Sequence, residues 1–455
     1  MAANQIVDVQ AFLNAHRFSR FQWVIFALCF LVVLLDGFDT AAIGYIAPSL
    51  ITEWGVERSA LAPVLSAALF GLAGGALCSG PLADRLGRKT VLIGAVLVFG
   101  LACLSSSFSG SLDHLVIWRF VTGLGLGAAM PNAVTLMSEY CPDKRRATLV
   151  NTMFCGFPLG AAFGGFLAAW MIPLWGWRSV LELGGAVPLV LAALMLALLP
   201  ESVRHMVATG QPVERIRRAL HRISASVADA KSFTMTEKGA APTRARSGAT
   251  IVLSRAYVVG SVSLWVAYFM GLVIFYALIN WMPILFKDAG LDSRSAALIA
   301  ALFPLGGVGA VFFGFLMDRF NGNLVIAAGF ALTAVAIYLI GHTAGELGLL
   351  IPAVFIGGTL MNTAQSSLPA LAAAFYPTAG RATGVGWMLG FGRFGGIAGS
   401  FLVAALTAWH LSFGGIFAVV AIPGLVSAAA LVIKQLAHPE QAAAGVSVKG
   451  EALGH

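Results

Sequence analysis

The stretch Leu34-Leu35-Asp36-Gly37-Phe38-Asp39 places two carboxylates inside an apolar run that extends from residue 21 to residue 47. Such a run is long enough to cross a bilayer, which takes about 20 apolar residues. A carboxylate at the centre of a spanning helix costs about 2.5–3.5 kcal/mol on insertion scales. Two of them therefore require a polar cavity, a bound proton or a nearby cation.

The spacing of the two acids suggests proton binding. Asp36 and Asp39 are three residues apart, so they share one face of a helix. Two carboxylates this close resist being ionised together, and the pair can carry a proton at neutral pH. We therefore predict that both are proton-coupling residues. The alternative is a pair of polar residues that only lock neighbouring helices together.

The composition is that of a polytopic membrane protein, because 59% of the 455 residues are hydrophobic and only 11% are charged. The five cysteines lack the spacing of a metal site or a disulfide framework. The polar first 20 residues do not fit a signal peptide. No Walker motif or nucleophile–base set is present, so we expect neither an ATP-driven pump nor an enzyme, and no metal or organic cofactor.

Twelve apolar spans can be drawn along the chain, six on each side of one long polar connection. They cover residues 21–47, 59–79, 90–109, 113–138, 147–171, 178–199, 255–280, 294–317, 323–341, 347–371, 382–406 and 412–434. The sequence therefore predicts an all-α membrane protein with twelve transmembrane helices. Its predicted parts are an N-terminal six-helix half (1–199), a central loop (200–254), a C-terminal six-helix half (255–434) and a tail (435–455).

The distribution of Lys and Arg predicts the topology. Of 28 such residues, 22 fall on the side of the N-terminus, four fall on the other side and two lie within spans. By the positive-inside rule, both termini and the central loop are cytoplasmic. The net charge of +8 is thus a topology signal and does not call for a nucleic-acid partner.

The central loop contains apolar residues at helical spacing with arginines on the remaining faces. This pattern predicts a helix that lies on the anionic inner leaflet or, alternatively, a solvated regulatory face. Residues 225–250 are rich in Ala, Ser, Thr and Lys, which is typical of a flexible linker. The helical set is Val213, Ile216, Leu220 and Ile223, with Arg215, Arg217, Arg218 and Arg222.

Two short motifs recur at nearly one offset. Gly80-Pro81-Leu82-Ala83-Asp84-Arg85 returns as Gly314-Phe315-Leu316-Met317-Asp318-Arg319, and Pro142-x-x-x-Arg146-Ala147-Thr148 returns as Pro377-x-x-x-Arg381-Ala382-Thr383. Both pairs follow the second or fourth span of a half. They predict two parallel, pseudo-symmetric six-helix halves around a central cavity.

These motifs carry a family resemblance. The run Gly80-x-Leu82-Ala83-Asp84-Arg85-x-Gly87-Arg88-Lys89 resembles the signature loop between helices 2 and 3 of the major facilitator superfamily. Arg119-x-x-x-Gly123-x-Gly125-x-Gly127 is similar to its helix-4 pattern, and Pro200-Glu201-Ser202 is a further shared feature. The resemblance implies the major facilitator fold.

Within this superfamily, nearly the whole chain is similar to the aromatic acid:proton symporters, and most of all to their 4-hydroxybenzoate and protocatechuate group. The likeness rests on Asp36-Gly37-Phe38-Asp39-Thr40-Ala41-Ala42, on residues 381–390, on Gly123-Leu124-Gly125-Leu126-Gly127 and on Phe375-Tyr376-Pro377-Thr378. It implies a proton-coupled symporter that imports such an acid. It also implies a cytoplasmic gating network of Asp84, Arg85, Arg88, Glu139, Arg146, Asp318 and Arg381. The second-half loop lacks the basic residues that follow Asp84, so we expect the first half to dominate that network.

Two arginines inside spans are candidates for binding the substrate carboxylate. At about 1.5 Å per residue, Arg119 lies at a depth similar to that of Asp36 and Asp39, so it can also be their counter-ion. Alternatively, Arg119 snorkels to the outer interface. Arg393 lies nearer the midplane, where a buried guanidinium suits bidentate capture of a carboxylate. Its alternative role is an internal ion pair with an acid of the first span.

Aromatic and amide side chains complete the predicted substrate site. Phe38 and Tyr268 can contact an aromatic ring, although helix packing is the simpler role for most such residues. Asn280 and Gln365 can hydrogen-bond a ring hydroxyl or bridge helices. The alternative function is a proton antiporter that exports aromatic acids or drugs, which Gly156-Phe157-Pro158-Leu159-Gly160 favours only weakly. We also expect a monomer in the bacterial inner membrane whose partners are the acid, protons and lipid.

Overall fold

The computed structural model describes residues 6–228, 230–235, 248–309, 320–343, 345–376 and 378–439. Within these ranges, 11 helices are long and apolar enough to cross a membrane. The protein is therefore a multi-pass membrane protein. The twelfth predicted span, 294–317, begins with α13 (Ser293–Leu305) and η3 (Gly306–Gly309), and its remainder lies outside the described residues.

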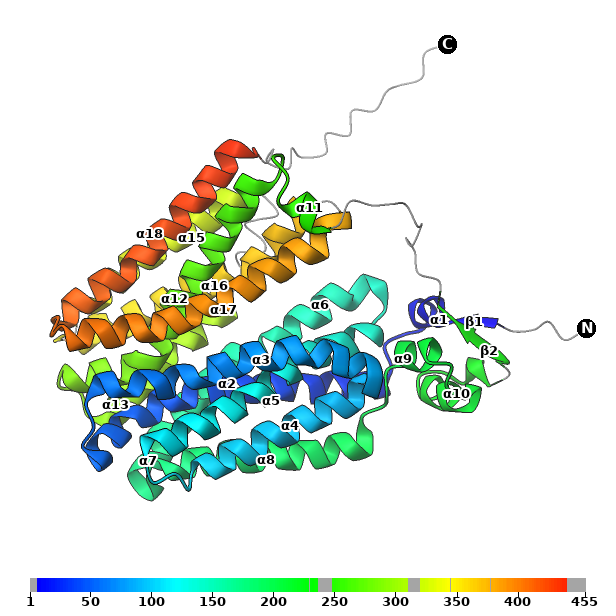
Figure 1. The fold of residues 1–455 in the computed structure, drawn as a ribbon, viewed down its shortest axis with the longest axis horizontal. Helices are drawn as coiled ribbons and strands as arrows, with labels where there is room; N and C mark the ends of the chain where they lie inside the picture. Colours follow the sequence, from blue (N-terminus) through cyan, green and yellow to red (C-terminus); the bar gives the residue numbers. More distant parts are fainter. Residues whose placement is uncertain are drawn as a thin grey trace, which may run out of the picture. The chain divides into compact units, whose positions relative to one another are not determined.

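The long helices follow the order of the predicted spans (Figure 1). Those of the first sequence half are α2 (Arg20–Trp54), α3 (Ala62–Leu86), α4 (Arg88–Ser106), α5 (Leu112–Glu139), α7 (Gly156–Trp175) and α8 (Arg178–Leu198). Those of the second are α12 (Val258–Asp288), α15 (Gly322–His342), α16 (Leu347–Phe375), α17 (Thr378–Ala408) and α18 (Phe413–Ala437). Short elements around them include η1 (Arg58–Leu61), α6 (Asp143–Phe154) and α11 (Gly248–Val252).

Helix α2 carries both acids of the opening motif and is longer than its predicted span. It begins at a capping box, in which Gln22 N donates to Ser19 Oγ and Ser19 N donates to Gln22 Oε1. It continues through Pro48 and ends only at Gly55, whose φ of 62° suits a left-handed C-cap. The helix therefore extends beyond the apolar run, because its ends are set by capping residues.

Helix α2 packs closely against α7. A side chain at Gly37 would collide with the backbone of Phe157, and one at Gly160 would collide with the backbone of Leu34. Small residues at these two positions let the backbones approach each other, as is common between membrane helices. This contact holds the segment that carries Asp36 and Asp39 inside the bundle.

The internal contacts divide the chain into two compact units that do not coincide with the predicted halves. Unit 1 contains Met1–Thr243, Ala277–Leu305 and Ser400–Leu411, and unit 2 contains Arg244–Tyr276, Gly306–Gly399 and Ser412–His455. The last part of α12, α13 and the end of α17 thus belong with the helices of the first half. The division into sequence halves stays a prediction about symmetry.

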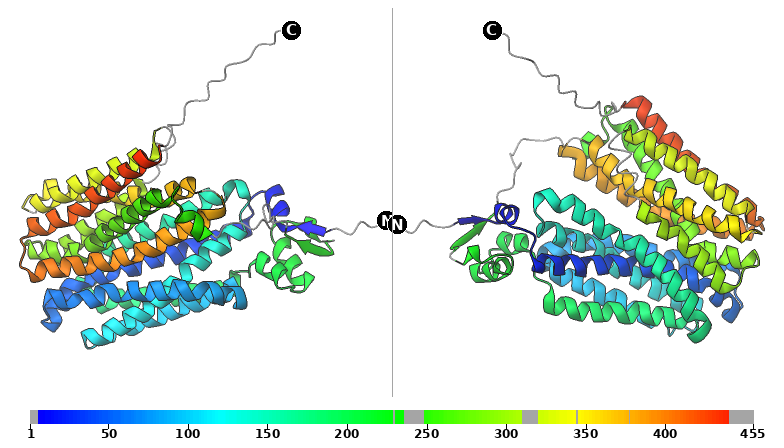
Figure 2. Two further views of the ribbon diagram at one scale, coloured as in Figure 1. Left: turned by 45° about the horizontal axis from the view of Figure 1, so that its top comes forward. Right: turned by 180° about the vertical axis from the view of Figure 1, so that it is seen from behind.

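A small cap extends from unit 1 on the predicted cytoplasmic side (Figure 2). Its two strands, β1 (Ile6–Asp8) and β2 (Ser232–Thr234), pair in parallel with Val7 opposite Phe233. Helices α1 (Val9–Ala15), α9 (Val203–Ala208) and α10 (Val213–His221) and the turn η2 (Ala225–Val227) pack with them. The N-terminal segment and the central loop therefore fold together. Of the predicted linker at 225–250, residues 225–228 and 230–235 belong to this cap, residues 248–250 begin α11, and the rest lies outside the described residues.

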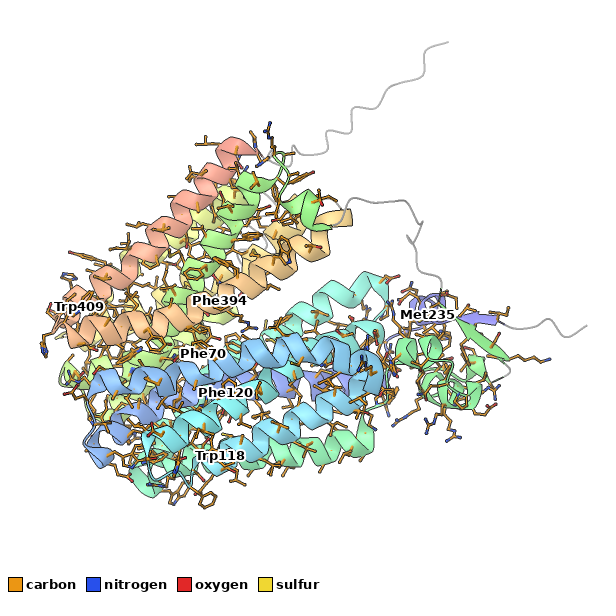
Figure 3. All side chains as sticks on the ribbon, viewed as in Figure 1. Phe70, Trp118, Phe120, Met235, Phe394 and Trp409 are labelled. Atoms are coloured by element: carbon orange, nitrogen blue, oxygen red, sulfur yellow. The ribbon has the colours of Figure 1, made fainter. Side chains whose placement is uncertain are left out.

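The apolar face of α10 is covered by protein. Ile216 and Leu220 are buried in the same apolar cluster as Leu13 and Phe21, whereas Arg218 is exposed. Side chains that are covered in this way do not insert into a lipid surface. The prediction of a helix lying on the inner leaflet is wrong in that respect, and the solvated face fits the structure. Large exposed apolar residues occur instead on the spanning part, such as Trp118 on α5 and Trp409 after α17 (Figure 3).

Candidate functional site

A fully buried ion pair joins α2 to α5 within unit 1. Arg119 Nη1 lies 2.8 Å from Asp39 Oδ1, and both side chains are 0% exposed. Arg119 Nη2 also donates to the backbone carbonyl of Asp39 at 3.2 Å. The guanidinium does not reach the protein surface, so the snorkelling alternative for Arg119 is wrong. The counter-ion interpretation agrees with this geometry.

The pair leaves part of its hydrogen-bonding capacity unused. Asp39 Oδ2 and Arg119 Nε are buried and have no hydrogen-bond partner among the described residues. Burying two charges is costly, and their mutual attraction repays the cost only when further hydrogen bonds complete the site. A proton on Asp39 would remove one charge and weaken the bond to Arg119. The pair is therefore an element whose strength depends on protonation.

Asp36 lies one helical turn before Asp39 and is 2% exposed. Its carboxylate accepts a hydrogen bond from Thr40 Oγ1 at 3.4 Å. The structure thus places both predicted proton-coupling residues inside unit 1, away from the protein surface. Phe38, which lies between these two acids in the sequence, is buried. Its ring packs against Gly164 on α7 and Gly184 on α8. Its predicted contact with substrate stays a prediction.

A second polar cluster lies in unit 2 and contains three of the predicted substrate-binding residues. Gln365 on α16 donates to the backbone carbonyl of Tyr268 on α12 at 3.3 Å. A side chain at Gly392, the residue before Arg393 on α17, would collide with the Tyr268 ring, so Arg393 and Tyr268 lie close together. Gln365 Oε1 is buried without a partner among the described residues. Helical packing therefore gathers an arginine, a phenol and an amide from three different helices.

Arg393 differs from Arg119 in its pairing. Its side chain is half-buried, and among the described residues of unit 2 no carboxylate forms an ion pair with it. The predicted alternative, an ion pair with an acid of the first span, would join residues of different units and stays a prediction, although Asp39 already has Arg119 as its partner. Arg393 retains the donors that a bound carboxylate requires.

Aromatic rings lie on the same two helices as Tyr268 and Arg393. Trp265 is 5.9 Å from Trp387 and 6.3 Å from Phe391, and Phe269 is 5.2 Å from Phe391, measured between ring centroids. The Trp265 Nε1 atom is buried and has no hydrogen-bond partner in the described part of the chain. These rings supply an apolar, polarisable surface beside the polar cluster, which suits an aromatic ring.

Asn280 belongs to unit 1, whereas this cluster belongs to unit 2. Its Nδ2 donates to Ser400 Oγ at 3.0 Å and to the Leu65 carbonyl at 3.5 Å. It therefore connects α12, α17 and α3, which is the bridging role left open for the amides. Its role as a substrate ligand stays a prediction.

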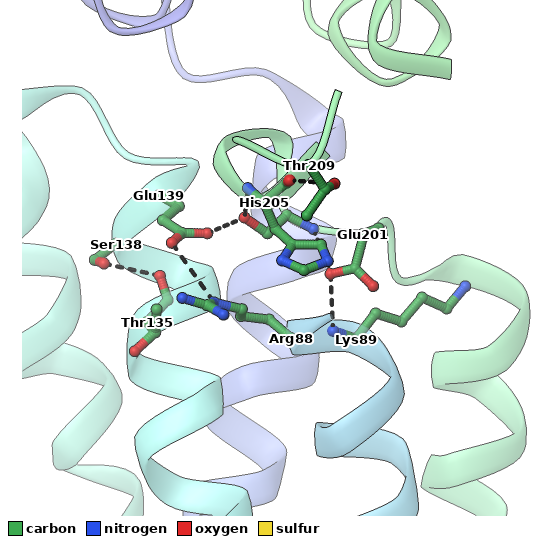
Figure 4. Close-up of polar contacts among 9 residues, drawn as sticks. Arg88, Lys89, Thr135, Ser138, Glu139, Glu201, His205 and Thr209 are labelled. Atoms are coloured by element: carbon green, nitrogen blue, oxygen red, sulfur yellow. Dashed lines mark hydrogen bonds and ion pairs between the residues drawn. The ribbon is translucent and has the colours of Figure 1, made fainter. Parts of the chain in front are cut away.

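Charged residues gather at the predicted cytoplasmic ends of α4 and α5 (Figure 4). Arg88 Nε lies 4.0 Å from Glu139 Oε1, and Glu139 also accepts a hydrogen bond from Ser202. Lys89 N donates to Glu201 Oε1 at 3.1 Å. Of the predicted gating residues, the structure thus brings Arg88 and Glu139 together.

Among the other predicted gating residues, the structure describes the side chain of Arg85 alone. Arg85 is exposed. Asp318 lies outside the described residues, as do the side chains of Asp84, Arg146 and Arg381. The gating role of the whole set stays a prediction.

Sequence reasoning missed two residues of this network, Glu201 and Ser202. Their motif was quoted only as a family feature, although a carboxylate and a hydroxyl directly after a span are a usable signal. The Tyr140 hydroxyl donates to the Glu201 carbonyl at 2.6 Å, and burial raises the pKa of Tyr140 well above its ordinary value. Tyr140 therefore stays a neutral donor, and the segment after α8 is fixed to the ends of α4 and α5.

A further set of polar contacts lies at the predicted outer ends of helices in unit 1. Arg58 pairs with Asp288 at 2.7 Å, and Lys287 Nζ donates to Thr52 Oγ1 at 3.0 Å and to the Pro48 carbonyl at 3.3 Å. In the sequence, Arg58 and Lys287 served only in the count of basic residues that predicts the topology. These contacts join residues more than 200 positions apart, which no local pattern reveals.

Comparisons with known proteins place this geometry in a family. The model of the Major Facilitator Superfamily matches residues 29–399 and 264–452. The 4-hydroxybenzoate transporter PcaK of Pseudomonas aeruginosa is 49% identical over 96% of this chain and 97% of its own length. A gallate transporter of Pseudomonas putida is 44% identical over 93% of this chain and 94% of its own.

A solved structure supports the same fold. A xylose transporter of Escherichia coli, in an inward-open conformation, matches with a TM-score of 0.70 over 90% of this chain and 95% of its own, at 17% identity. At that identity the likeness concerns the fold alone. The spans, the family match and this neighbour together indicate the twelve-helix fold predicted from the sequence, and the chain belongs to the Major Facilitator Superfamily.

Proposed function

We propose that this protein is a proton-coupled symporter that imports a small aromatic carboxylate, such as 4-hydroxybenzoate or protocatechuate, across the bacterial inner membrane. Relatives named as 4-hydroxybenzoate and gallate transporters, 44–49% identical over more than nine tenths of the chain, support the substrate class. The charge distribution supports cytoplasmic termini. The protein acts as a monomeric carrier, not an enzyme, and protons are its only coupling species.

One observation carries the assignment of the substrate anion to Arg393. Of the two arginines predicted to bind it, Arg119 is already bonded to Asp39, whereas Arg393 pairs with no carboxylate among the described residues of unit 2. A guanidinium can hold a carboxylate through two parallel N–H···O bonds. Tyr268 and Gln365 lie beside it and offer hydrogen bonds to the substrate, and the rings of α12 and α17 suit its aromatic face.

Asp36 and Asp39 supply the proton site. Moving an anion into a negative interior costs about 2.3 kcal/mol per charge per 100 mV. One co-transported proton cancels that charge, and a second adds a driving force. A proton that binds Asp39 would loosen the bond to Arg119, and its release would restore it. Proton binding and helix packing are coupled by this one contact.

The test is uptake of a panel of substituted benzoates by proteoliposomes with an imposed pH gradient. We expect accumulation when the outside is acidic, and we expect Asp36→Asn to abolish uphill uptake while counterflow of labelled substrate continues. Asp36 is the cleaner position because Asn at 39 would also leave Arg119 without its partner. The exposed Asp113 on α5 provides the matched control, Asp113→Asn.

The same experiment separates the alternatives. An antiporter would expel the acid under the gradient that drives import by a symporter. Full uphill accumulation by Asp36→Asn and by Asp39→Asn would remove proton coupling from the proposal, and a vesicle without counterflow would argue against a carrier.

A further inference from the structure

The offset that relates the repeated sequence motifs also relates two prolines inside long helices. Pro48 lies within α2 and Pro283 within α12, and they are 235 positions apart, as are Pro142 and Pro377. A proline has no backbone N–H, so the carbonyl four residues earlier loses its helical donor and the helix can bend there. The first helix of each sequence half therefore has a weak point at an equivalent position.

The two weak points are in contact. The carbonyls that lose their donors belong to Gly44 in α2 and to Ile279 in α12. A side chain at Gly44 would collide with the carbonyl of Ile279 and with the backbone of Asn280, so the two helices cross backbone to backbone. Both segments belong to unit 1, although they come from different sequence halves.

Beyond the prolines, polar contacts join the two helix ends. Lys287 Nζ donates to Thr52 Oγ1 at 3.0 Å and to the Pro48 carbonyl at 3.3 Å, and Lys287 and Thr52 are themselves 235 positions apart. Arg58 pairs with Asp288 at 2.7 Å, with side chains that are 51% and 26% exposed. Because ion pairs that contact water contribute little, these contacts hold the ends together weakly and can form and break repeatedly.

We propose that residues 49–54 of α2 and 284–288 of α12 form an outer latch, which bends open at Pro48 and Pro283 and is held closed by Lys287. The inference rests on the proposed carrier function and on the predicted topology, which places these ends outside. A carrier exposes its binding site to each side in turn. Contacts that join the two sequence halves at the outer side must therefore break in each cycle, whereas contacts within one half can persist.

The first test bridges the latch. In the double variant Thr52→Cys with Lys287→Cys, a reducible bifunctional thiol reagent joins α2 to α12, and we expect counterflow of labelled 4-hydroxybenzoate in proteoliposomes to stop until a reductant releases the bridge. The matched control is Glu53→Cys with Arg178→Cys, which replaces an ion pair of 2.7 Å between α2 and the start of α8. Both control positions belong to the first sequence half, so this bridge should leave counterflow unchanged. Counterflow by protein whose 52–287 bridge is complete by mass spectrometry would overturn the inference, as would equal inhibition by both bridges.

The second test needs no substrate. Ala47→Cys places a thiol at a fully buried position of α2 near Gly44. Adding Lys287→Met should make this thiol react about two- to tenfold faster with a membrane-impermeant reagent, which is the shift in equilibrium that one hydrogen bond produces. Adding Arg294→Met instead removes an exposed basic residue at the start of α13 and should leave the rate unchanged. Equal rates in the two backgrounds would overturn the inference. Faster labelling in Lys287→Met, in a protein that shows no counterflow, would contradict the proposed function and leave the latch standing.

Discussion

The two arginines inside the spanning helices occupy opposite situations. Arg119 is completely buried, and its guanidinium bonds to both the carboxylate and the backbone carbonyl of Asp39. Arg393 is half-buried and pairs with no carboxylate among the described residues of unit 2. A charged guanidinium is costly to place in a membrane in both cases, and Arg119 has its compensating charge within its own unit. The contrast shows that Arg119 stabilises an internal charge, and it supports the proposed role of Arg393 in binding the substrate carboxylate.

The largest effect is expected when one partner of the buried pair between Asp39 and Arg119 is removed. Asp39→Asn leaves Arg119 buried with its charge, and a guanidinium does not lose its proton in a protein. We expect a loss of about 3–5 kcal/mol in the free energy of unfolding. Arg119→Gln should cost less, because the remaining carboxylate can take up a proton. The double variant should be more stable than Asp39→Asn.

Thermal unfolding of the purified protein in detergent measures this order. A double variant no more stable than Asp39→Asn alone would show that the pair does not hold α2 to α5. The conservative substitution Asp39→Glu serves as a control, since it keeps the charge.

The next comparison concerns Arg393, whose removal should affect binding and leave stability nearly unchanged. Hydrogen bonds to charged groups contribute about 1.5–3 kcal/mol, so Arg393→Gln should weaken binding of 4-hydroxybenzoate by about tenfold to a hundredfold. The affinity of Arg393→Lys should lie between those of the wild-type protein and Arg393→Gln, because an ammonium keeps the charge but lacks the planar pair of donors. Calorimetric titration gives the affinity, with Arg218→Gln in the exposed face of α10 as control. If Arg393→Gln binds 4-hydroxybenzoate as tightly as the wild-type protein, Arg393 does not hold the carboxylate and Arg119 becomes the candidate.

The smallest effect is expected at Tyr268, which sharpens the description of the unit 2 cluster. Tyr268→Phe removes only the hydroxyl beside Gln365 and Arg393. A neutral hydrogen bond is worth about 0.5–1.5 kcal/mol, so affinity should fall about two- to tenfold while the ring contacts remain. The exposed Tyr338 provides the control substitution, Tyr338→Phe. If both variants bind the acid equally well, the Tyr268 hydroxyl does not contact it.

Sequence patterns located the spanning helices well and their ends less well. The first span was predicted to end at residue 47, but α2 continues to Trp54 through Pro48, because a glycine C-cap and not hydropathy terminates it. Likewise α12 extends to Asp288, eight residues beyond its predicted end, and carries the charged residues that bond to α2 and to Arg58. Hydropathy locates the part of a helix that lies in the hydrocarbon core of the bilayer. These helices extend beyond that core, so hydropathy does not locate their ends.

The central loop shows where a local pattern was incomplete. The helical spacing of Ile216 and Leu220 correctly indicated a helix with one apolar face. Which surface covers that face depends on the N-terminal segment, whose strand β1 pairs with β2 more than 220 residues later in the chain. The periodicity of the loop does not show that the N-terminal segment covers this face. The prediction that the face lies on the membrane surface was therefore wrong.

By itself, the sequence determined that the chain spans a membrane many times, that two carboxylates lie in the first span, and that two arginines lie in others. Hydropathy, charge counts and helical rise are local quantities, and they give the depth of a residue along its helix. Only the tertiary structure decided that Asp39 belongs to Arg119 and that Arg393 stands beside Tyr268 and Gln365. These pairings depend on the rotation and packing of different helices: Asp39 and Arg119 are 80 positions apart, and Tyr268 and Gln365 are 97. The packing in turn depends on close contacts such as that between Gly37 and Phe157.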